Sequence, residues 1–237
     1  LLDPKPIEKS KFNSTILENE GIYSITLIEG VDGNKSSPNT IKNRLENSGI
    51  TSKNLIIDIT NYIMLEQGQP LHAFDADKLE AITKTKVNQE SFNLRQARNG
   101  EEINTIDGKI YTLDHNCNVV TCNDIAIALA GIMGGIESCV DENTRRIWLE
   151  SAIFSQVSVR NSARKLGIRT ESSIRYEKGI ATQGNFIPVE KAIKIYNENF
   201  PTKLIGSWYS GNRNIANRVV RLRKSRVKQV LGKLKFD

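Results

Sequence analysis

Glu150 stands out among the acidic residues because apolar side chains precede and follow it in the sequence. Ile147–Leu149 come before it, and Ala152 and Phe154 come after it. A carboxylate in such a stretch is expected to be half-buried, and it then needs hydrogen-bond donors or a cation. Two interpretations stay open: an ion pair with an arginine, or an acceptor directed at the hydroxyl of a ligand. The arginines that could form the ion pair are Arg164, Arg169 and Arg175.

A second candidate is the glycine-rich segment Ala128–Gly135, which follows an apolar stretch and ends in the pair Gly134-Gly135. Glycines let a backbone turn sharply, and they let a ligand approach the backbone N–H groups. The segment has neither the lysine of a phosphate-binding loop nor the spacing of a dinucleotide fingerprint, which argues against nucleotide binding. On pattern alone, a tight turn between strands is favoured over a ligand-binding loop.

His72 and Asn61 are polar residues in otherwise apolar surroundings. His72 is one of only two histidines, and an imidazole can act as a general acid or base near neutral pH. A single histidine beside Ala73 and Phe74 is nevertheless more often structural. Asn61 could contact a ligand, although capping of the helix that follows is the simpler explanation.

Arg160 and Arg164 are four residues apart in a predicted helix, so they share one face of it. The helix contains no Asp or Glu that could pair with them. This favours an anion, and we take both arginines as candidate phosphate contacts; a purely solvated face is the alternative.

Composition limits the possible functions. The net charge is +6, but nine Lys or Arg and one Asp lie between Arg213 and Asp237, so the rest of the chain is slightly acidic. The main part therefore has no basic face for a long nucleic acid and could at most contact a short single-stranded end. The three cysteines fit no zinc pattern and are expected to be reduced thiols of a cytoplasmic protein. No apolar run approaches the ~20 residues of a membrane helix.

The helices and strands expected from the sequence indicate an α+β domain over residues 1–211. A strand and a helix over residues 212–237 are expected to begin another domain. The Asn99-Gly100 and Asp107-Gly108 dipeptides are strong turn signals between short strands. Strands are expected at Ile22–Glu29, Leu55–Asp58, Thr85–Ala97, Lys109–Leu113, Val119–Cys122, Ala126–Ala130, Arg146–Leu149, Lys203–Tyr209 and Val219–Arg223. Helices are expected from Ser37-Pro38 to Leu45, from about Thr60, from Ser155 to Leu166, from Asn185 to Phe200, and from Ser225 to Leu231.

Five motifs follow one another along the chain: Asn61-Tyr62, Gly68–Asp75, Ala128–Gly135, Leu149-Glu150 and Thr170–Glu177. In this order they resemble the beta chain of bacterial phenylalanyl-tRNA synthetase, in its editing module of paired third and fourth domains. The resemblance covers roughly Ser37 to Lys178. The sequence departs from the family pattern at Thr40, at Ser172 and over Lys178–Ala181.

The resemblance implies an α+β fold with mixed or antiparallel sheets and packed helices, and hydrolysis of tyrosine wrongly attached to tRNA(Phe). An apolar phenylalanine site cannot strongly reject one added hydroxyl, so a second site that requires this hydroxyl corrects the error. Glu150 and the N–H near Gly134 would bind the tyrosyl hydroxyl, while His72 and Asn61 would lie near the ester as catalytic candidates. The other substrate-binding positions would be Met133, Thr170 and Ser172.

The family also implies partners outside this chain. ATP and Mg²⁺ would be used by the full synthetase, in a cytoplasmic heterotetramer of two alpha and two beta chains that binds the tRNA(Phe) acceptor end. We expect no cofactor, metal site or membrane contact in this segment. One alternative is a non-catalytic tRNA-binding or subunit-assembly module in which Glu150 is merely ion-paired. Another is a free-standing deacylase, which the start at Leu1 without Met argues against.

Overall fold

Strand β10 (Arg146–Ile153) lies inside the largest sheet, and every one of its residues from Ile147 onward is buried. In the computed structural model, which describes residues 8–9, 21–181, 186–211 and 219–232, five strands pair in the order β1-β11-β2-β10-β3. β1 runs parallel to β11, and the other neighbours are antiparallel. The remaining bounds are β1 (Glu8–Lys9), β11 (Lys203–Gly211), β2 (Ile22–Glu29) and β3 (Leu71–Asp75).

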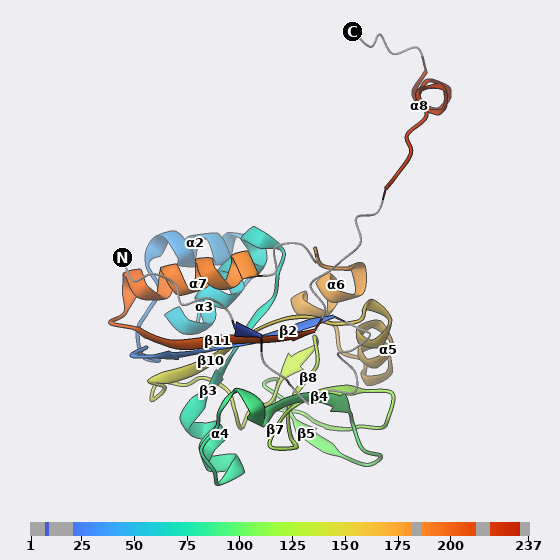
Figure 1. Cartoon of the computed structure of the whole chain (residues 1–237). Coiled ribbons are helices and arrows are strands. Elements are labelled where there is room, and N and C mark those ends of the chain that lie inside the picture. Colours follow the sequence, from blue (N-terminus) through green and yellow to red (C-terminus); the bar gives the residue numbers. More distant parts are fainter. Residues whose placement is uncertain (1–7, 10–20, 182–185, 212–218, 233–237) are drawn as a thin grey trace.

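Because side chains alternate along a strand, β10 contributes to a different core on each face of the sheet. Ile147 and Leu149 join a core formed with the helices, whereas Trp148 and Ala152 join a core formed with the smaller sheets. Figure 1 shows α2, α3 and α7 on one side of the large sheet and the smaller strands on the other. The helices on that side are α2 (Asn39–Asn47), α3 (Leu55–Gln67) and α7 (Phe186–Asn199).

The second layer consists of a four-stranded sheet in the order β4-β7-β8-β9 and a two-stranded sheet of β5 and β6. Two short helices connect β3 to β4. The protein is therefore α+β, with one mixed sheet and two antiparallel sheets. The bounds are α4 (Ala76–Thr83), η1 (Gln89–Ser91), β4 (Phe92–Gln96), β5 (Glu102–Asn104), β6 (Ile110–Thr112), β7 (Asn118–Cys122), β8 (Ile125–Leu129) and β9 (Met133–Gly134).

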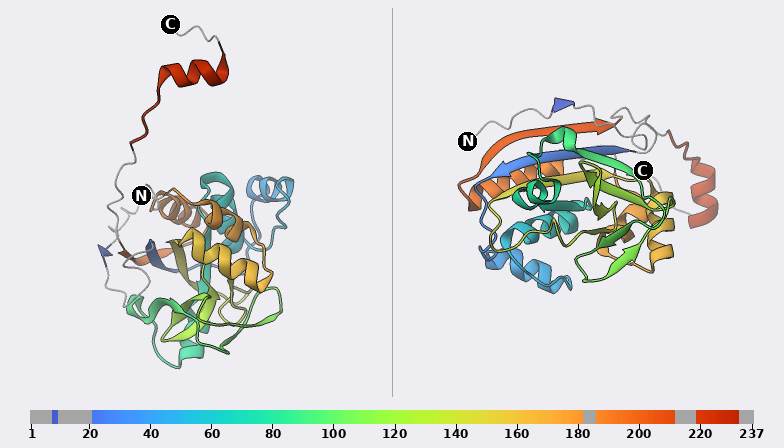
Figure 2. Two further views of the ribbon diagram at one scale, coloured as in Figure 1. Left: turned by 90° about the vertical axis from the view of Figure 1, so that its right-hand side faces the viewer. Right: turned by 90° about the horizontal axis from the view of Figure 1, so that it is seen from below.

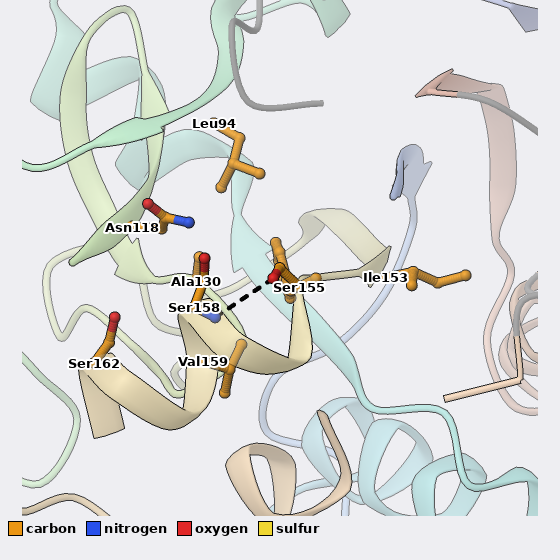
Figure 3. A pocket seen from close by; sticks show the side chains of 9 residues that line it. Leu94, Asn118, Ala130, Ile153, Ser155, Ser158, Val159 and Ser162 are labelled. Atoms are coloured by element: carbon orange, nitrogen blue, oxygen red, sulfur yellow. Dashed lines mark hydrogen bonds between the residues drawn. The ribbon is translucent and has the colours of Figure 1, made fainter. Parts of the chain in front are cut away.

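Two helices, α5 (Gln156–Leu166) and α6 (Glu171–Lys178), follow β10. Ser155 caps α5 by accepting a hydrogen bond from the Ser158 N–H, as Figure 3 shows. The hollow beside this cap holds about 10 Å³. That volume suits one water molecule at most, so this hollow is not a substrate site.

The predicted elements are largely confirmed, with one clear error in the first half of the chain. The strand expected over Leu55–Asp58 is instead the first turn of α3, because Asn54 caps the helix there by accepting from the Ile57 N–H at 3.0 Å. Of the β-branched residues of this run, Ile56 is buried and Ile57 is half-buried within the helix. The strand expected over Thr85–Ala97 forms only over Phe92–Gln96, because Asn88 caps the short helix η1 just before it. The elements β3, α4, η1, β5, β9 and α6 were not predicted.

α8 (Lys224–Leu231) buries none of its residues, and Figures 1 and 2 show it apart from the sheets. The helix expected from Ser225 to Leu231 is thus present. The strand expected over Val219–Arg223 does not form, and the side chains there are exposed. With no sheet edge to pair with, this segment lacks the partner that a strand needs.

Candidate functional site

A cavity of about 560 Å³ opens beside β3, at the edge of the five-stranded sheet. α3 forms one wall, the turn between β8 and β9 forms another, and the beginning of α6 closes a third side. Most of the lining residues are apolar, with a few polar groups among them. A cavity of this size and character is typical of a site for a small organic ligand.

Seven residues selected from the sequence line this single cavity, although they span more than a hundred positions of the chain. They come from α3, β3, β9, β10 and the N-terminal end of α6. The structure therefore brings the predicted catalytic and substrate-binding positions together. They are Asn61, His72, Met133, Gly134, Glu150, Thr170 and Ser172.

Glu150 is only 7% exposed, and it faces the layer of smaller sheets. It is paired across β10 and β3 with His72 and across β10 and β2 with Ile25. The Tyr23 hydroxyl donates a hydrogen bond of 2.9 Å to Glu150 Oε2. Among the described residues nothing donates to Oε1. No arginine of the described part pairs with Glu150, and Arg175 forms its ion pair with Glu171 instead.

The environment of Glu150 changes its acidity. Burial raises the pKa of Glu150 to about 7, and the hydrogen bond from Tyr23 opposes this by stabilising the carboxylate. The group therefore titrates close to neutral pH. Only its ionised form has both oxygens available as acceptors.

His72 and Gly134 lie in direct contact. A Cβ atom placed on Gly134 would lie 2.5 Å from His72 Cε1 and 2.6 Å from its Nε2, so only glycine fits beside the ring. Nε2 is buried and has no hydrogen-bond partner among the residues that the structure describes, and burial lowers the pKa of His72 to about 4. The imidazole is thus neutral at pH 7. It also packs edge-on against Phe74, with ring centroids 4.5 Å apart.

The glycine-rich segment forms the tight hairpin turn that its pattern predicts. Gly131 adopts a φ of +70°, and the Ile132 N–H bonds the Leu129 carbonyl at 3.0 Å. The Gly134 carbonyl accepts from the Ile106 N–H at 3.1 Å. The same turn lines the cavity, so the glycines serve the turn and also leave its backbone facing the space for a ligand.

Thr170 connects α6 to that turn. Its hydroxyl donates to the Ile132 carbonyl at 2.9 Å and accepts from the Ser173 N–H at 3.0 Å, which completes a capping box with Ser173. The proton of the Thr170 hydroxyl is therefore already donated within the protein, to the Ile132 carbonyl. Ser172, the second residue of α6, is half-buried and lines the cavity.

Asn61 lies in the middle of α3, not at its beginning. The explanation that it caps a helix is therefore wrong, since Asn54 fills that role. The half-buried side chain of Asn61 lines the cavity, and so does that of its neighbour Thr60.

Arg160 and Arg164 lie on α5 and do not line this cavity. The Arg160 guanidinium donates to the Glu177 carbonyl at 3.0 Å, where it satisfies the end of α6. Arg164 is exposed and lines a separate polar cavity of about 490 Å³ with His115. Within the described ranges, Lys53 is the one Lys or Arg that lines the main cavity.

Two buried polar residues at the site were not selected from the sequence. Tyr23 lies 127 positions from Glu150, and only the pairing of β2 with β10 reveals their contact. Gln69 donates to the Ala152 carbonyl at 2.8 Å, and its Oε1 is buried without a partner. Gln69 belongs to the motif Gly68–Asp75, and its place in that motif was the only sequence feature that could have indicated a role at the site.

Over the described ranges, no group of three or more His, Cys, Asp or Glu is arranged to hold a metal ion. No helix in those ranges is long and apolar enough to span a membrane. Cys117, Cys122 and Cys139 are free thiols.

Comparison with known families gives one match, to the B3/4 domain, over residues 20–200. Curated relatives include the phenylalanine–tRNA ligase beta subunit of Prochlorococcus marinus (strain MIT 9313), 46% identical over 98% of this chain and 29% of that protein. The same subunit of Synechococcus sp. (strain CC9605) is 47% identical over 90% of this chain and 26% of its own length. The chain thus spans less than a third of the relatives it matches.

A solved N-terminal fragment of the phenylalanyl-tRNA synthetase beta subunit from Pyrococcus horikoshii covers 70% of this chain and 52% of its own, at 13% identity. Its TM-score is 0.38, which is too low to support an argument about this protein.

Proposed function

The chain belongs to the B3/4 domain family, and we propose that it is the editing module of a phenylalanine–tRNA ligase beta subunit, which hydrolyses tyrosine wrongly attached to tRNA(Phe). The observation that carries the proposal is Glu150. It is a nearly buried carboxylate in a mostly apolar cavity of about 560 Å³, with Oε1 free of donors from the described residues. A buried carboxylate oxygen without a donor is energetically costly, and the hydroxyl of a tyrosyl substrate can donate the missing hydrogen bond to Oε1.

The cavity supports discrimination between tyrosine and phenylalanine. A phenol that donates to Oε1 of the carboxylate makes a charge-assisted hydrogen bond, whereas a phenyl ring would cover this oxygen and leave it without a donor. In this proposal the Gly134 N–H contacts the same substrate oxygen. Met133, Thr170 and Ser172 shape the wall around the ring.

Asn61 and His72 would lie toward the ester and the terminal ribose. The His72 imidazole is neutral at pH 7, as a general base must be, but its Nε2 is covered beside Gly134. We therefore favour a water molecule held by backbone groups and the ribose hydroxyl as the attacking group. His72 then supports the wall that positions the substrate.

The acceptor end of tRNA would reach the mouth of the cavity past Lys53, and Arg164 would meet phosphate farther along. Arg160 has less freedom to do so because it holds the end of α6. In the complete ligase, ATP and Mg²⁺ would serve phenylalanine activation, and an alpha chain would complete an α₂β₂ assembly in the cytoplasm.

Substitution of Glu150 tests the proposal. Glu150→Ala removes the acceptor, which contributes about 1.5–3 kcal/mol as a hydrogen bond to a charged group. Hydrolysis of tyrosyl-tRNA should then fall roughly ten- to a hundredfold, with less discrimination against phenylalanyl-tRNA. Glu150→Gln keeps the shape and one acceptor oxygen, so it should lose less. Deacylation of both charged tRNAs by the complete ligase is the measurement.

The alternative, a non-catalytic tRNA-binding or assembly module, predicts a different result. Wild-type ligase would then leave tyrosyl-tRNA intact, and Glu150→Ala would alter only stability or assembly. An unchanged tyrosine-to-phenylalanine ratio in an active Glu150→Ala enzyme would show that the site is wrongly assigned.

A further inference from the structure

Tyr23 and Glu150 form a buried hydrogen bond between two ionisable side chains, of which Glu150 lines the cavity. Tyr23 is 1% exposed, and its hydroxyl donates to Glu150 Oε2 at 2.9 Å across 127 positions of sequence. β2 and β10 are fully paired over eight residues, with Ile25 opposite Glu150 and Tyr23 opposite Ala152. The Tyr23 ring thus reaches Glu150 diagonally from the neighbouring strand.

The two oxygens of the Glu150 carboxylate differ in their hydrogen bonding. Oε2 accepts from Tyr23, whereas nothing in the described part donates to Oε1. A carboxylate held by one oxygen on a rigid strand has its second oxygen in a fixed direction. Without that contact, the carboxylate could rotate or take up a proton.

We propose that Tyr23 is a specificity-determining positioning residue, which orients the Glu150 carboxylate so that Oε1 meets a phenolic hydroxyl of the substrate. The inference rests on the proposed editing function and adds to it a residue on a different strand. A single carboxylate then accepts from two phenols, one from the protein and one from the substrate. Tyr23 itself does not touch the substrate.

The ionisation of Glu150 gives an independent reason for this role. Hydrogen bonding from Tyr23 stabilises the carboxylate and so lowers a pKa that burial raises. The other titratable groups facing this region are His72 on β3, Tyr176 on α6 and Cys122 on β7. His72 is neutral at pH 7, and the Tyr176 hydroxyl donates elsewhere, to the Ala152 carbonyl at 3.0 Å. Among the described residues, Tyr23 is therefore the only hydrogen-bond donor to the carboxylate.

Tyr23→Phe tests the proposal because it removes the hydroxyl and keeps the ring that packs in the core. In the complete ligase, kcat/KM for tyrosyl-tRNA hydrolysis should fall about tenfold, the loss expected for one hydrogen bond to a charged group. The acid side of its pH profile should move to higher pH. Phenylalanyl-tRNA hydrolysis should be unchanged.

Tyr196→Phe is the matched control. Tyr196 is equally buried, and its hydroxyl donates to the Ile56 carbonyl at 2.9 Å, in the core on the opposite face of the sheet. The Tyr196→Phe variant should lose about as much free energy of unfolding as Tyr23→Phe, without a change in tyrosine selectivity or in the pH profile of hydrolysis. In a Glu150→Ala background, Tyr23→Phe should have no further effect on selectivity, since no carboxylate remains for Tyr23 to orient.

The outcomes separate this inference from the proposed function. A wild-type ligase that does not hydrolyse tyrosyl-tRNA overturns the function. A Tyr23→Phe enzyme with wild-type selectivity and pH profile overturns only the role of Tyr23. Carbon-13 titration of the Glu150 carboxyl provides a measurement that needs no activity. Its pKa should be higher in Tyr23→Phe, and equal pKa values in the two proteins would contradict the inference.

Discussion

Glu150 and His72 are direct partners across the antiparallel strands β10 and β3, so both side chains leave the same face of the sheet. Burial moves their acidities in opposite directions. It raises the pKa of the Glu150 carboxyl to about 7 and lowers that of the His72 imidazole to about 4. Each group avoids its charged form in the folded protein, which is the expected effect of desolvation.

These shifts predict opposing effects of pH on stability. Between pH 4.5 and about 7 the folded state binds the Glu150 proton more tightly than the unfolded state, so this contribution falls as pH rises. Between about pH 4 and 6.5 the unfolded state binds the His72 proton more tightly, so that contribution rises with pH. In the wild-type protein the two largely cancel over their shared window.

Single substitutions should reveal each contribution. Glu150→Gln should have a free energy of unfolding that rises with pH from about 4 to 6.5, with a slope of at most about 1.4 kcal/mol per pH unit. His72→Gln should show the reverse trend up to about pH 7. Urea unfolding at a series of pH values measures both. Parallel curves for the wild type and both variants would contradict the opposed shifts.

Thr170 should prove to be a structural tether. Thr170→Ala removes the cap of α6 and leaves the Ile132 carbonyl without its donor, which should cost about 1–2 kcal/mol of stability. Thr170→Ser keeps the hydroxyl and should restore most of it. Thermal unfolding is the measurement, together with hydrolysis of both charged tRNAs. We expect the two activities to fall together, and a selective loss for tyrosine would indicate direct substrate contact.

The segment after β11 should be the first to be cut by trypsin. Arg221, Arg223 and Lys224 are exposed, and α8 is an eight-residue helix that buries nothing. Such a helix is only marginally stable without tertiary packing. Limited digestion of this chain, followed by mass analysis, should find cleavage at these residues before any in the sheets. Protection there would contradict the proposed domain boundary near residue 211.

The sequence predicts most regular elements where local signals agree. Ser155 and Gly167 bound α5 as expected, because a serine cap and a left-handed glycine are local features. The run Leu55–Ile59 misleads because apolar β-branched residues suit a buried strand as well as a buried helix. Only the Asn54 cap distinguishes the two, and it is a weak signal by itself.

Residues of the site are predictable from motifs, but their partners are not. An arginine was one of the two partners that the sequence left open for Glu150, whereas its donor in the structure is Tyr23, which has no distinguishing pattern in its strand. That contact depends on which strand lies beside β10. Pairing between distant strands is a property of the whole fold, so neither composition nor spacing reveals it.

Gly134 should not accept a larger side chain without a rearrangement of the cavity wall, because a Cβ there would lie 2.6 Å from His72 Nε2. Gly134→Ala must displace either the imidazole or β9, at a cost typical of overpacking, about 1–3 kcal/mol. If the clash is the cause, His72→Ala should relieve it, and the double variant should be more stable than the sum of the single effects predicts. Unfolding free energies of the four proteins give this coupling. Additive effects would mean that the backbone of β9, and not the imidazole, resists the larger side chain. Gly134→Trp should also abolish tyrosyl-tRNA hydrolysis by filling the cavity, a loss that His72→Ala should not restore.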